Sequence, residues 1–498
     1  MVTLSTNQPW FYNDICEEMR LFLDLTDIIP VESEPPMSDG DVHMSINLYE
    51  RGGLYEAHAV CSYMNGSQRL TGDCIHTAAA RTEGDIIVKR HKKRCTKIAA
   101  FRAMEKLFPQ RIPWGSLTGI RPTRLWRELL ETMSCNEAAH IMLDEFDVTP
   151  EKLKVAADIT RVQQKAFAAQ TPNDIDIYIG IPYCKSKCLY CSFASCVRTP
   201  KTDIGAYLDA LKKDILYGSR TVAENGFIVR AMYVGGGTPT VLTNDELDDL
   251  ITYALECYGG FGTEFTVEAG RPDTIDTQKL LTLRRLGVGR ISINPQTMNN
   301  DTLALIGRSH TADDISRAYF DARAVGFESI NADVIAGLPG ESNSHMQKTM
   351  EAIAALKPDN LTVHTLALKR SSALIEHLAE YKLPEAAEVE RMVETGARAA
   401  SEMGMRPYYM YRQKYMRGNL ENVGYSLPGR ECIYNIDMME ETTSIMAHGA
   451  GAMSKRIFDA ERRVERIPNP KDIATYINKL NVTATEKNKL FSQERGCV

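Results

Sequence analysis

The chain has 498 residues, of which 44% are hydrophobic and 25% are charged, and its formal net charge is −7. This length suggests about two to four domains, and the apolar content is sufficient to build their cores. The acidic balance argues against a general nucleic-acid binder.

The first residues, MVTLSTNQPWFYNDICEEMR, lack a basic start followed by an apolar core. No apolar run reaches the roughly 20 residues that a bilayer-spanning helix needs. We therefore expect no export signal, no membrane span and a cytoplasmic location, where cysteines are reduced or bind metal.

Residues 1 to about 170 are expected to form a small α+β module with a helical linker. Apolar periodicity predicts strands over Val42–Leu48 and Leu54–Ser62, then helices over Lys93–Leu107, Pro122–Glu131 and Glu151–Ala169. The basic run Lys89–Ala100 is superficially similar to a phosphate-binding helix of double-stranded-RNA-binding domains. The acidic chain favours the other interpretation, a solvated helix face.

Strand-like and helix-length stretches alternate from about Asp174 to Arg370, which is the pattern of a parallel βα array. The predicted strands are Ile175–Ile181, Ala231–Val234, Glu264–Glu268, Arg290–Asn294, Ser329–Ile335 and Leu361–Leu366. The predicted helices are Ile204–Glu224, Asp245–Tyr258, Ile275–Gly287, Ala312–Gly326 and Ser344–Leu356. Such repeats predict a partial TIM-like barrel, in which the chemistry gathers at the carboxyl ends of the strands.

Three cysteines follow the first of these strands. Cys184, Cys188 and Cys191 stand in the spacing C-x3-C-x2-C within YIGIPYCKSKCLYCSFAS. Three thiolates on one tight loop can bind three irons of a cubane [4Fe–4S] cluster, which leaves the fourth iron open to a small chelating molecule. A structural zinc site normally has four ligands, usually in two pairs, and no second pair is present. The spacing therefore favours an iron–sulfur site over zinc or chance clustering.

Glycine or polar residues follow several of the other strands. Gly235–Thr240 reads GGGTPT, and its glycines let the backbone approach a ligand closely. Glu268 ends a strand, where its carboxylate either accepts hydrogen bonds from hydroxyl or amino groups or is simply an exposed acid. Asp333 lies inside an apolar strand, so it is either a ligand contact or the partner of a neighbouring arginine.

Together these motifs resemble the radical S-adenosylmethionine (SAM) enzymes, and within them the oxygen-independent coproporphyrinogen III oxidases, also called coproporphyrinogen dehydrogenases. The resemblance covers Tyr178 to about Ser454 and rests on YIGIPYCKSKCLYC, GGGTPT, VEAGRP, SINPQTMN, LIGRSH, NADVIAGLPG, NVGYSLPG and HGAGAMS. The segments GIRPTRL and YYMYRQKYMRGNLENVGY are similar to the HemZ-like branch of that group.

The resemblance implies two cofactors, a [4Fe–4S] cluster and SAM. The cluster ligands would be Cys184, Cys188 and Cys191. The contacts of the first SAM would be Tyr178, Gly236, Glu268 and Met453. A second SAM-binding position would consist of Tyr190, Gly237, Thr238, Gln296, Arg308, Asp333 and Ala367. No residue is predicted as a catalytic acid or base.

The resemblance also implies an α/β fold in three parts: an N-terminal α+β module over residues 1–170, a partial (β/α)6 radical SAM barrel over 171–370, and a mixed α/β domain over 371–498 that covers the substrate. The implied reaction is oxidative decarboxylation of two coproporphyrinogen III propionates to vinyls, giving protoporphyrinogen IX in haem biosynthesis. A 5′-deoxyadenosyl radical derived from SAM would drive it. The implied partners are a tetrapyrrole substrate and an electron donor such as flavodoxin or ferredoxin, with no nucleic acid.

Two positions depart from the oxidase pattern. Phe193 stands where the oxidases usually carry a fourth cysteine, the next cysteine being Cys196, and Gly180 stands where a histidine is common. Both departures are shared with haem-trafficking relatives. A haem-binding carrier or chaperone therefore stays open, as does a haem-modifying radical SAM methylase.

The segment Pro407–Asn419, PYYMYRQKYMRGN, interleaves aromatic and basic residues. These residues are Tyr408, Tyr409, Tyr411, Tyr415, Arg412, Lys414 and Arg417. Guanidinium groups bind carboxylates in a fixed fork, so this segment could close over a flat tetrapyrrole with carboxylate arms. Ordinary aromatic packing in a strand pair is the alternative.

Overall fold

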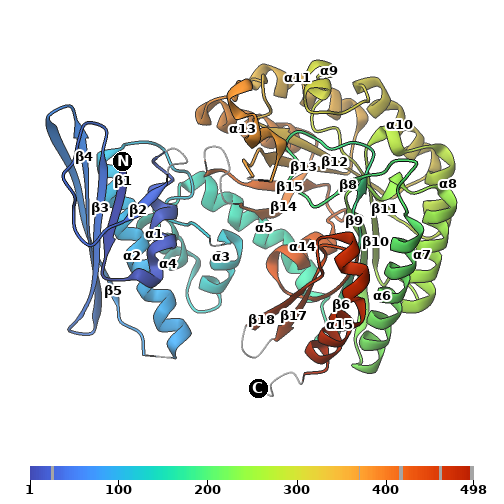
Figure 1. Ribbon diagram of the computed structural model, residues 1–498, viewed down its shortest axis with the longest axis horizontal. Coiled ribbons are helices and arrows are strands. Elements are labelled where there is room, and N and C mark those ends of the chain that lie inside the picture. The colour runs from blue at the N-terminus through green and yellow to red at the C-terminus, as the bar shows by residue number, and fades with distance from the viewer. Residues whose placement is uncertain are drawn as a thin grey trace. The chain divides into compact units, whose positions relative to one another are not determined.

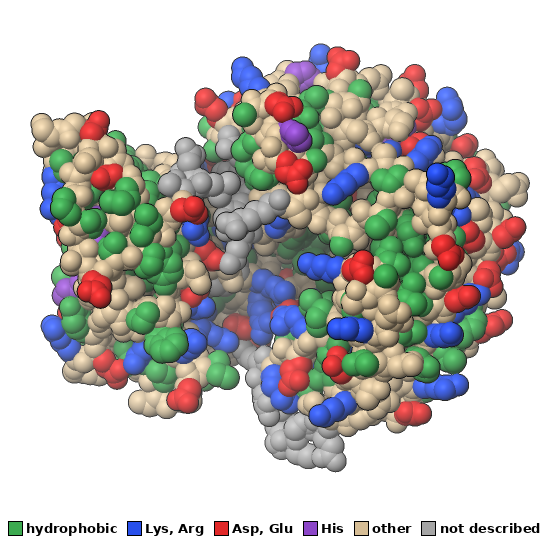
Figure 2. Space-filling view, in the orientation of Figure 1, with side chains coloured by type: hydrophobic (Ala, Val, Ile, Leu, Met, Phe, Trp, Pro, Cys, Tyr) green, Lys and Arg blue, Asp and Glu red, His purple; other side chains and the backbone are tan. Residues whose placement is uncertain are grey.

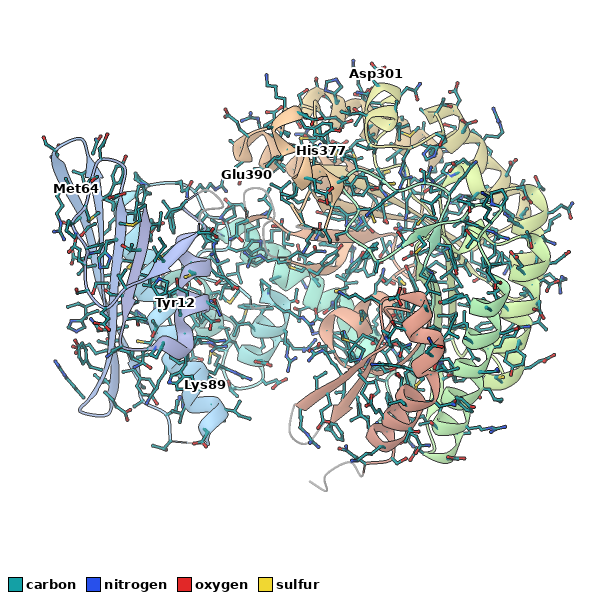
Figure 3. All side chains as sticks on the ribbon, in the orientation of Figure 1. Tyr12, Met64, Lys89, Asp301, His377 and Glu390 are labelled. Atoms are coloured by element: carbon teal, nitrogen blue, oxygen red, sulfur yellow. The ribbon has the colours of Figure 1, made fainter. Side chains whose placement is uncertain are left out.

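The computed structural model describes residues 1–23, 27–82, 84–119, 121–369, 371–413, 419–458 and 463–493. The chain divides into two compact units, Met1–Ala157 with Gly418–Leu420, and Asp158–Arg417 with Glu421–Val498. The division falls within helix α5 (Pro150–Ala168). Figure 1 labels the elements of both units, and Figure 3 labels Tyr12 and Lys89 in the first and Asp301 and His377 in the second.

The first unit is built on a five-stranded sheet in the order β2-β1-β3-β4-β5. The strands are β1 (Val2–Thr6), β2 (Ile28–Pro30), β3 (Val42–Arg51), β4 (Leu54–Asn65) and β5 (Gln68–Ala79). The helices are α1 (Tyr12–Met19), α2 (Asp85–Leu107), α3 (Pro122–Leu130) and α4 (Cys135–His140), the last continued by a π-helical turn over Ile141–Glu145.

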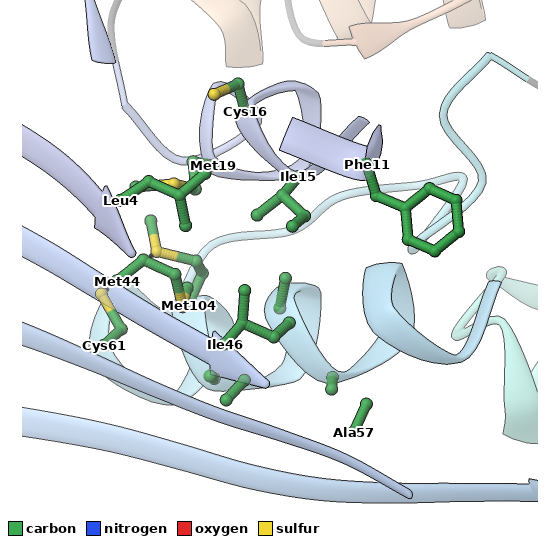
Figure 4. Close-up of a cluster of buried hydrophobic side chains, with 14 of the residues drawn as sticks. Leu4, Phe11, Ile15, Cys16, Met19, Met44, Ile46, Ala57, Cys61 and Met104 are labelled. Atoms are coloured by element: carbon green, nitrogen blue, oxygen red, sulfur yellow. Dashed lines mark hydrogen bonds between the residues drawn. The ribbon is translucent and has the colours of Figure 1, made fainter. Parts of the chain in front are cut away.

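Alternate residues of the central strands bury one face of this sheet. Met44 and Ile46 of β3 and Ala57 and Cys61 of β4 pack against Met104 of α2 and against residues of α1 in one hydrophobic cluster (Figure 4). Period-two alternation of this kind is typical of a sheet covered on one side. The unit therefore has a core of its own.

The structure confirms the predicted α+β character of this module and adds elements that the sequence did not predict. The unpredicted elements are β1, β2, β5, α1 and α4 with its π-helical turn. The basic run Lys89–Ala100 lies within α2, where Lys92 pairs with Glu50 at 3.0 Å and Lys93 with Asp14 at 3.3 Å.

The second unit is built on an eleven-stranded sheet in the order β14-β15-β13-β12-β11-β10-β9-β6-β16-β17-β18. Six consecutive parallel strands form its centre: β6 (Asp174–Ile181), β9 (Ile228–Gly236), β10 (Glu264–Gly270), β11 (Arg290–Ile293), β12 (Ser329–Ala336) and β13 (Asn360–Thr365). The predicted partial barrel of six βα units is confirmed.

Helices cover the outer side of these parallel strands (Figure 1). They are α6 (Gly205–Glu224), α7 (Asn244–Tyr258), α8 (Thr277–Arg285), α10 (Ala312–Val325) and α11 (Asn343–Leu356), with the short α9 (Asn300–Leu305) before α10. Local sequence fixes their ends: α7 begins at a capping box of Thr243 and Glu246 and ends at Gly259, whose φ is 70°.

The C-terminal residues extend the same sheet at both edges. Their strands are β14 (Arg406–Tyr411), β15 (Asn422–Ser426), β16 (Ser444–His448), β17 (Met453–Phe458) and β18 (Arg463–Pro468). Their helices are α12 (Ala373–Glu376), α13 (Ala386–Glu402), α14 (Ile433–Glu440) and α15 (Ile473–Phe491). β15 pairs antiparallel with β13, while β16 pairs parallel with β6. The residues predicted as a separate covering domain thus share a sheet with the barrel, and the predicted boundary near residue 370 stays a prediction.

No helix in the described part of the chain is long and apolar enough to cross a membrane. Acidic and basic side chains are interspersed over the face seen in Figure 2.

Candidate active site

The cysteine loop leaves the carboxyl end of β6. Within it β7 (Tyr183–Cys184) pairs with β8 (Cys196–Val197), and the amide of Cys191 donates to the carbonyl of Cys188 at 3.1 Å. All three cysteines are partly buried and form no disulfide. Burial, with a contribution from Cys188 and Cys184, raises the pKa of the Cys191 thiol. The loop therefore gathers three sulfur ligands at the carboxyl edge of the sheet.

The glycine motif that follows β9 packs directly against this loop. A Cβ on Gly237 would lie 2.9 Å from the Sγ of Cys184, so only glycine fits there. The amide of Thr238 donates to the carbonyl of Tyr183 at 2.8 Å, and its hydroxyl donates to the Sγ of Cys184 at 3.6 Å. Gly236 has a φ of 110°. The structure thus brings together Cys184, Gly236, Gly237 and Thr238, which were predicted from separate motifs.

A stack of three tyrosines lies inside the barrel. The ring of Tyr233 stacks on Tyr434 of α14 at 4.5 Å between centroids, and Tyr178 stacks on both at 6.2 to 6.3 Å. Tyr178 and Tyr233 are register neighbours on β6 and β9. These rings form an aromatic cluster within the barrel, beside Glu268 of β10.

Glu268 of β10 lies beside this stack. The Tyr233 hydroxyl donates to its Oε1 at 2.6 Å, and a Cβ on Gly235 would lie 3.1 Å from its Oε2. Burial raises the pKa of Glu268 from 4.5 to about 7, although the Tyr233 hydrogen bond acts in the opposite direction. Glu268 is therefore a partly buried, hydrogen-bonded acid, which does not agree with the interpretation as an exposed strand-end acid.

Asp333 of β12 lies in a polar cluster with His364 of β13. Asn331 Nδ2 donates to Asp333 Oδ1 at 2.7 Å, His364 Nε2 lies 3.5 Å from Oδ2, and His364 Nδ1 lies 3.1 Å from the hydroxyl of Tyr411. Burial would raise the pKa of Asp333, but His364, Asn331 and Thr362 outweigh it and hold the pKa below its usual value. The neighbours of Asp333 are thus a histidine and an amide, not the arginine considered above.

Gln296 connects to this cluster through its backbone. Its amide donates to the carbonyl of Asp333 at 2.8 Å, and its φ of 68° is in the left-handed region that favours glycine. Its side chain is buried, and its Oε1 has no hydrogen-bond partner among the described residues. A strained backbone that presents an unpaired buried polar atom is typical of a ligand-binding position.

Arg308 and Tyr190 join the cysteine loop to the turn after α9. Arg308 Nη1 donates to the carbonyl of Asn294 at 2.7 Å, and Nη2 donates to the Tyr190 hydroxyl at 3.3 Å. Ala367 follows β13, between Leu366 and Leu368 of a hydrophobic cluster that Tyr190 also contacts. Met453 begins β17, two strands away from β6, and is 41% exposed. It lies on the opposite side of β6 from the strands that carry Glu268 and Asp333.

The donor set fits a cubane cluster with a bound SAM. Among residues whose placement is described, no three His, Cys, Asp or Glu side chains converge enough to hold a single metal ion. A cubane makes no such demand, because each thiolate binds a different iron. The buried and unpaired Gln296 Oε1 supplies a free acceptor at a strand end of the same sheet.

The aromatic segment after β13 is only partly involved. Tyr408 and Tyr409 of β14 are buried in the barrel core with Tyr434, which agrees with the packing interpretation for these two residues. Tyr411 differs, because it reaches His364. Lys414, Tyr415 and Arg417 lie outside the described residues.

Sequence reasoning missed several residues of this site. Tyr233, His364 and Arg271 are on or just after the predicted strands, and Tyr434 is on α14. His364 carries the same signal that identified Asp333, a polar residue inside an apolar strand, so it could have been found. Tyr434 gave no such signal, because its place in the barrel depends on long-range packing.

Comparison with known proteins agrees with this geometry. The model of the Radical SAM superfamily matches residues 178–353. The oxygen-independent coproporphyrinogen-III oxidase-like protein HemZ of Bacillus subtilis is 39% identical over 386 residues, which cover 76% of this chain and 77% of that protein. The heme chaperone HemW of Bacillus subtilis is 33% identical over 196 residues, 39% of this chain and 50% of that protein.

A solved structure shows the same fold. Coproporphyrinogen III oxidase (HemN) from Escherichia coli, described as a radical SAM enzyme, superposes with a TM-score of 0.52 at 22% identity, covering 65% of this chain and 73% of that one. The chain therefore belongs to the radical SAM superfamily, in the family of the HemZ oxygen-independent coproporphyrinogen III oxidase-like proteins, and its cofactors are a [4Fe–4S] cluster and SAM.

Proposed function

We propose that this chain catalyses the oxygen-independent oxidative decarboxylation of coproporphyrinogen III to protoporphyrinogen IX. The carrying observation is the tyrosine stack of Tyr178, Tyr233 and Tyr434, with Glu268 beside it and the Asp333–His364–Tyr411 cluster on neighbouring strands. Aromatic rings suit the apolar parts of a tetrapyrrole, and His364 and the Tyr411 hydroxyl can donate hydrogen bonds to its carboxylate arms. The name of the HemZ relative and the fold of HemN support the same reaction.

In this proposal Cys184, Cys188 and Cys191 hold the cluster, and Tyr178, Gly236, Glu268 and Met453 contact the SAM bound to it. Tyr190, Gly237, Thr238, Gln296, Arg308, Asp333 and Ala367 form the second SAM-binding position. Bound together, the cluster and SAM supply one-electron hydrogen-abstraction chemistry, which such a reaction needs because an unactivated propionate carbon has no acidic proton.

The chain's own groups would orient and shield the reactants. The Glu268 carboxylate accepts hydrogen bonds from SAM, and ligand donors at this partly buried acid favour its ionised form. We therefore expect SAM binding to release a proton near neutral pH. The tyrosine stack excludes water, which would otherwise quench reactive species. A flavodoxin or ferredoxin as electron donor and a cytoplasmic location complete the proposal.

A haem carrier is the second candidate. Phe193, at the position of the fourth oxidase cysteine, is 70% exposed, and an exposed aromatic ring beside the cysteine loop could contact haem instead of holding iron. The HemW match supports this alternative. A carrier should bind haem stably and leave coproporphyrinogen III unchanged.

The test is an anaerobic assay with the reconstituted chain, SAM, a reductant and coproporphyrinogen III. Mass spectrometry follows monovinyl and divinyl products and 5′-deoxyadenosine. We expect vinyl products that disappear in Cys188→Ala. Cys196→Ala is the matched control, because Cys196 is an exposed cysteine of the same loop region outside the trio, and it should keep the activity.

Absence of vinyl products from a fully loaded protein that binds haem would reject the oxidase proposal and favour the carrier. Methylated haem in the same assay would favour a methylase. The proton release is tested separately by calorimetry of SAM binding in two buffers of different ionisation enthalpy, with Glu268→Gln as the control.

A further inference from the structure

Arg271, the arginine of the segment VEAGRP, is directed at the central cysteine of the trio. It follows β10 and is buried, with 3% of its surface exposed. Its Nη1 lies 2.7 Å from Ser186 Oγ and 3.9 Å from the Sγ of Cys188. The sulfur of Cys188 therefore accepts a hydrogen bond from a buried guanidinium.

The turn after α9 also holds the cysteine loop in place. Ser186 Oγ donates to the carbonyl of Gly307 at 2.9 Å, and the amide of Leu189 donates to the carbonyl of Ile306 at 3.0 Å. A Cβ on Gly307 would lie 3.2 Å from the carbonyl of Lys187. The loop that carries Cys188 is therefore supported by contacts with this turn as well as by Arg271.

A carboxylate balances the charge of Arg271, at the Nε and Nη2 atoms of the guanidinium. Asp273 Oδ1 accepts from Arg271 Nε at 3.0 Å and Oδ2 accepts from Nη2 at 3.2 Å, which is a bidentate pair. Burial would raise the pKa of Asp273, but His310, Arg271 and Lys185 hold it well below its usual range, so the group is ionised. The nearby Lys185 is half exposed and is screened by solvent.

We propose that Arg271 raises the reduction potential of the [4Fe–4S] cluster by directing an N–H group at the sulfur of Cys188, and that Asp273 limits this effect by pairing with the same guanidinium. The proposal rests on Cys188 as a cluster ligand. It does not depend on which tetrapyrrole reaction the chain performs.

The sign follows from charge balance. Reduction takes one electron from an external donor and makes the cluster more negative by one charge, while no bond to the protein forms or breaks. Hydrogen bonds to the ligand sulfurs and nearby cations stabilise this extra charge, more so in a buried site. Removing the cation should therefore lower the potential, and removing the balancing carboxylate should raise it.

The experiment is a redox titration of the reconstituted full-length protein without SAM, with dithionite as reductant and mediator dyes. Electron paramagnetic resonance follows the reduced cluster. We expect a more negative midpoint potential for Arg271→Gln, a more positive one for Asp273→Asn, and a smaller negative shift for Arg271→Lys, which keeps the charge but loses the planar fork.

The matched control is an exposed arginine–aspartate pair of the same unit. Arg285 Nη2 lies 2.5 Å from Asp248 Oδ2 on the outer helices. Arg285→Gln and Asp248→Asn make the same changes of charge there, and neither should move the potential. Iron and sulfide contents confirm that each variant carries the same cluster.

Opposite shifts distinguish the proposal from a purely structural role, because a displaced loop would move both variants in the same direction. Equal potentials for wild type and Arg271→Gln, or shifts of the same sign in Arg271→Gln and Asp273→Asn, overturn it. If Arg271→Gln does not take up the cluster, Asp273→Asn decides: a positive shift supports the proposal, and no shift or a negative one rejects it.

Discussion

At the scale of single residues, Glu268 gives the second unit a measurable pH dependence. Burial raises the pKa of its carboxyl to about 7 in the folded state, against an ordinary value of 4.5 for this side chain. The folded state therefore binds this proton more tightly than the unfolded state. Its contribution to stability is present below pH 4.5 and is lost as the pH rises to 7, at about 1.4 kcal/mol per unit and about 3 kcal/mol in all.

Glu268→Gln should remove this dependence. Urea unfolding at pH 5 and pH 8, followed by circular dichroism in the absence of SAM, should show a smaller loss of stability for the variant than for the wild type. Equal losses in the two proteins would show that Glu268 titrates normally.

Substitution of Gln296 should affect the stability of the protein and its affinity for SAM differently. A non-glycine residue held at a positive φ costs about 1 kcal/mol or more, and here the φ is 68°. Gln296→Gly relieves this strain and loses the side chain, so we expect an unchanged or higher melting temperature together with SAM binding at least several-fold weaker by calorimetry. Gln296→Ala keeps the strain and should be the less stable of the two. A Gln296→Gly variant with normal SAM affinity would remove Gln296 from the proposed contacts.

At the scale of elements, one buried carboxylate fastens the C-terminal helix to the barrel. Asp214 of α6 accepts from Lys487 Nζ of α15 at 2.9 Å, from the Tyr476 hydroxyl at 2.9 Å and from the amide of Gly449 at 3.2 Å, and His448 Nδ1 lies at 3.2 Å. Removing one partner of a buried pair leaves the other charge uncompensated.

Asp214→Ala should therefore lower the free energy of unfolding by about 3–5 kcal/mol. Thr485→Ala on an exposed face of the same helix should change it by less than about 0.5 kcal/mol. A loss below about 1 kcal/mol for Asp214→Ala in urea unfolding would contradict a fastening role, since buried pairs are worth more than that.

The parallel strands of the barrel were predictable because each is a short apolar run followed by a helix with a clear period. The run at Ile175–Ile181, for example, is β6 to within one residue. β5 was missed because Thr71, Gly72 and Asp73 interrupt its apolar pattern. The pairing of β16 with β6 could not be predicted, since no local signal specifies which strand a distant segment joins.

The candidate site likewise combines local features that the sequence predicts with tertiary contacts that it does not. The cysteine spacing and the glycine motif are local, and the structure places them in contact. The direction of Arg271 toward Cys188 depends instead on how the turn after β10 meets the cysteine loop, a tertiary relation that the segment VEAGRP does not contain.

At the scale of the whole molecule, the tryptophans report on one unit alone. The chain has three, and Trp10, Trp114 and Trp126 all lie within Met1–Ala157. Trp114 and Trp126 are buried while Trp10 is 82% exposed. Tryptophan fluorescence should therefore follow the first unit, whereas circular dichroism follows both.

If the units unfold independently, as their separate cores suggest, Asp214→Ala should shift the circular dichroism transition to lower urea and leave the fluorescence transition unchanged. Coincident shifts of both signals would show that the two units unfold as one cooperative system.

The position of β6 in the sheet has a consequence for synthesis on the ribosome. The strand that leads into the cysteine loop has β9 on one side and β16 on the other, and β16 begins at Ser444. The second neighbour is thus made roughly 260 residues after β6, a delay of about 15–50 s at ordinary rates of elongation. During that time the loop with the three cysteines follows a strand that has one edge without a paired neighbour. Cluster insertion after release of the finished chain would avoid this interval, and early insertion would have to occur on a half-built barrel.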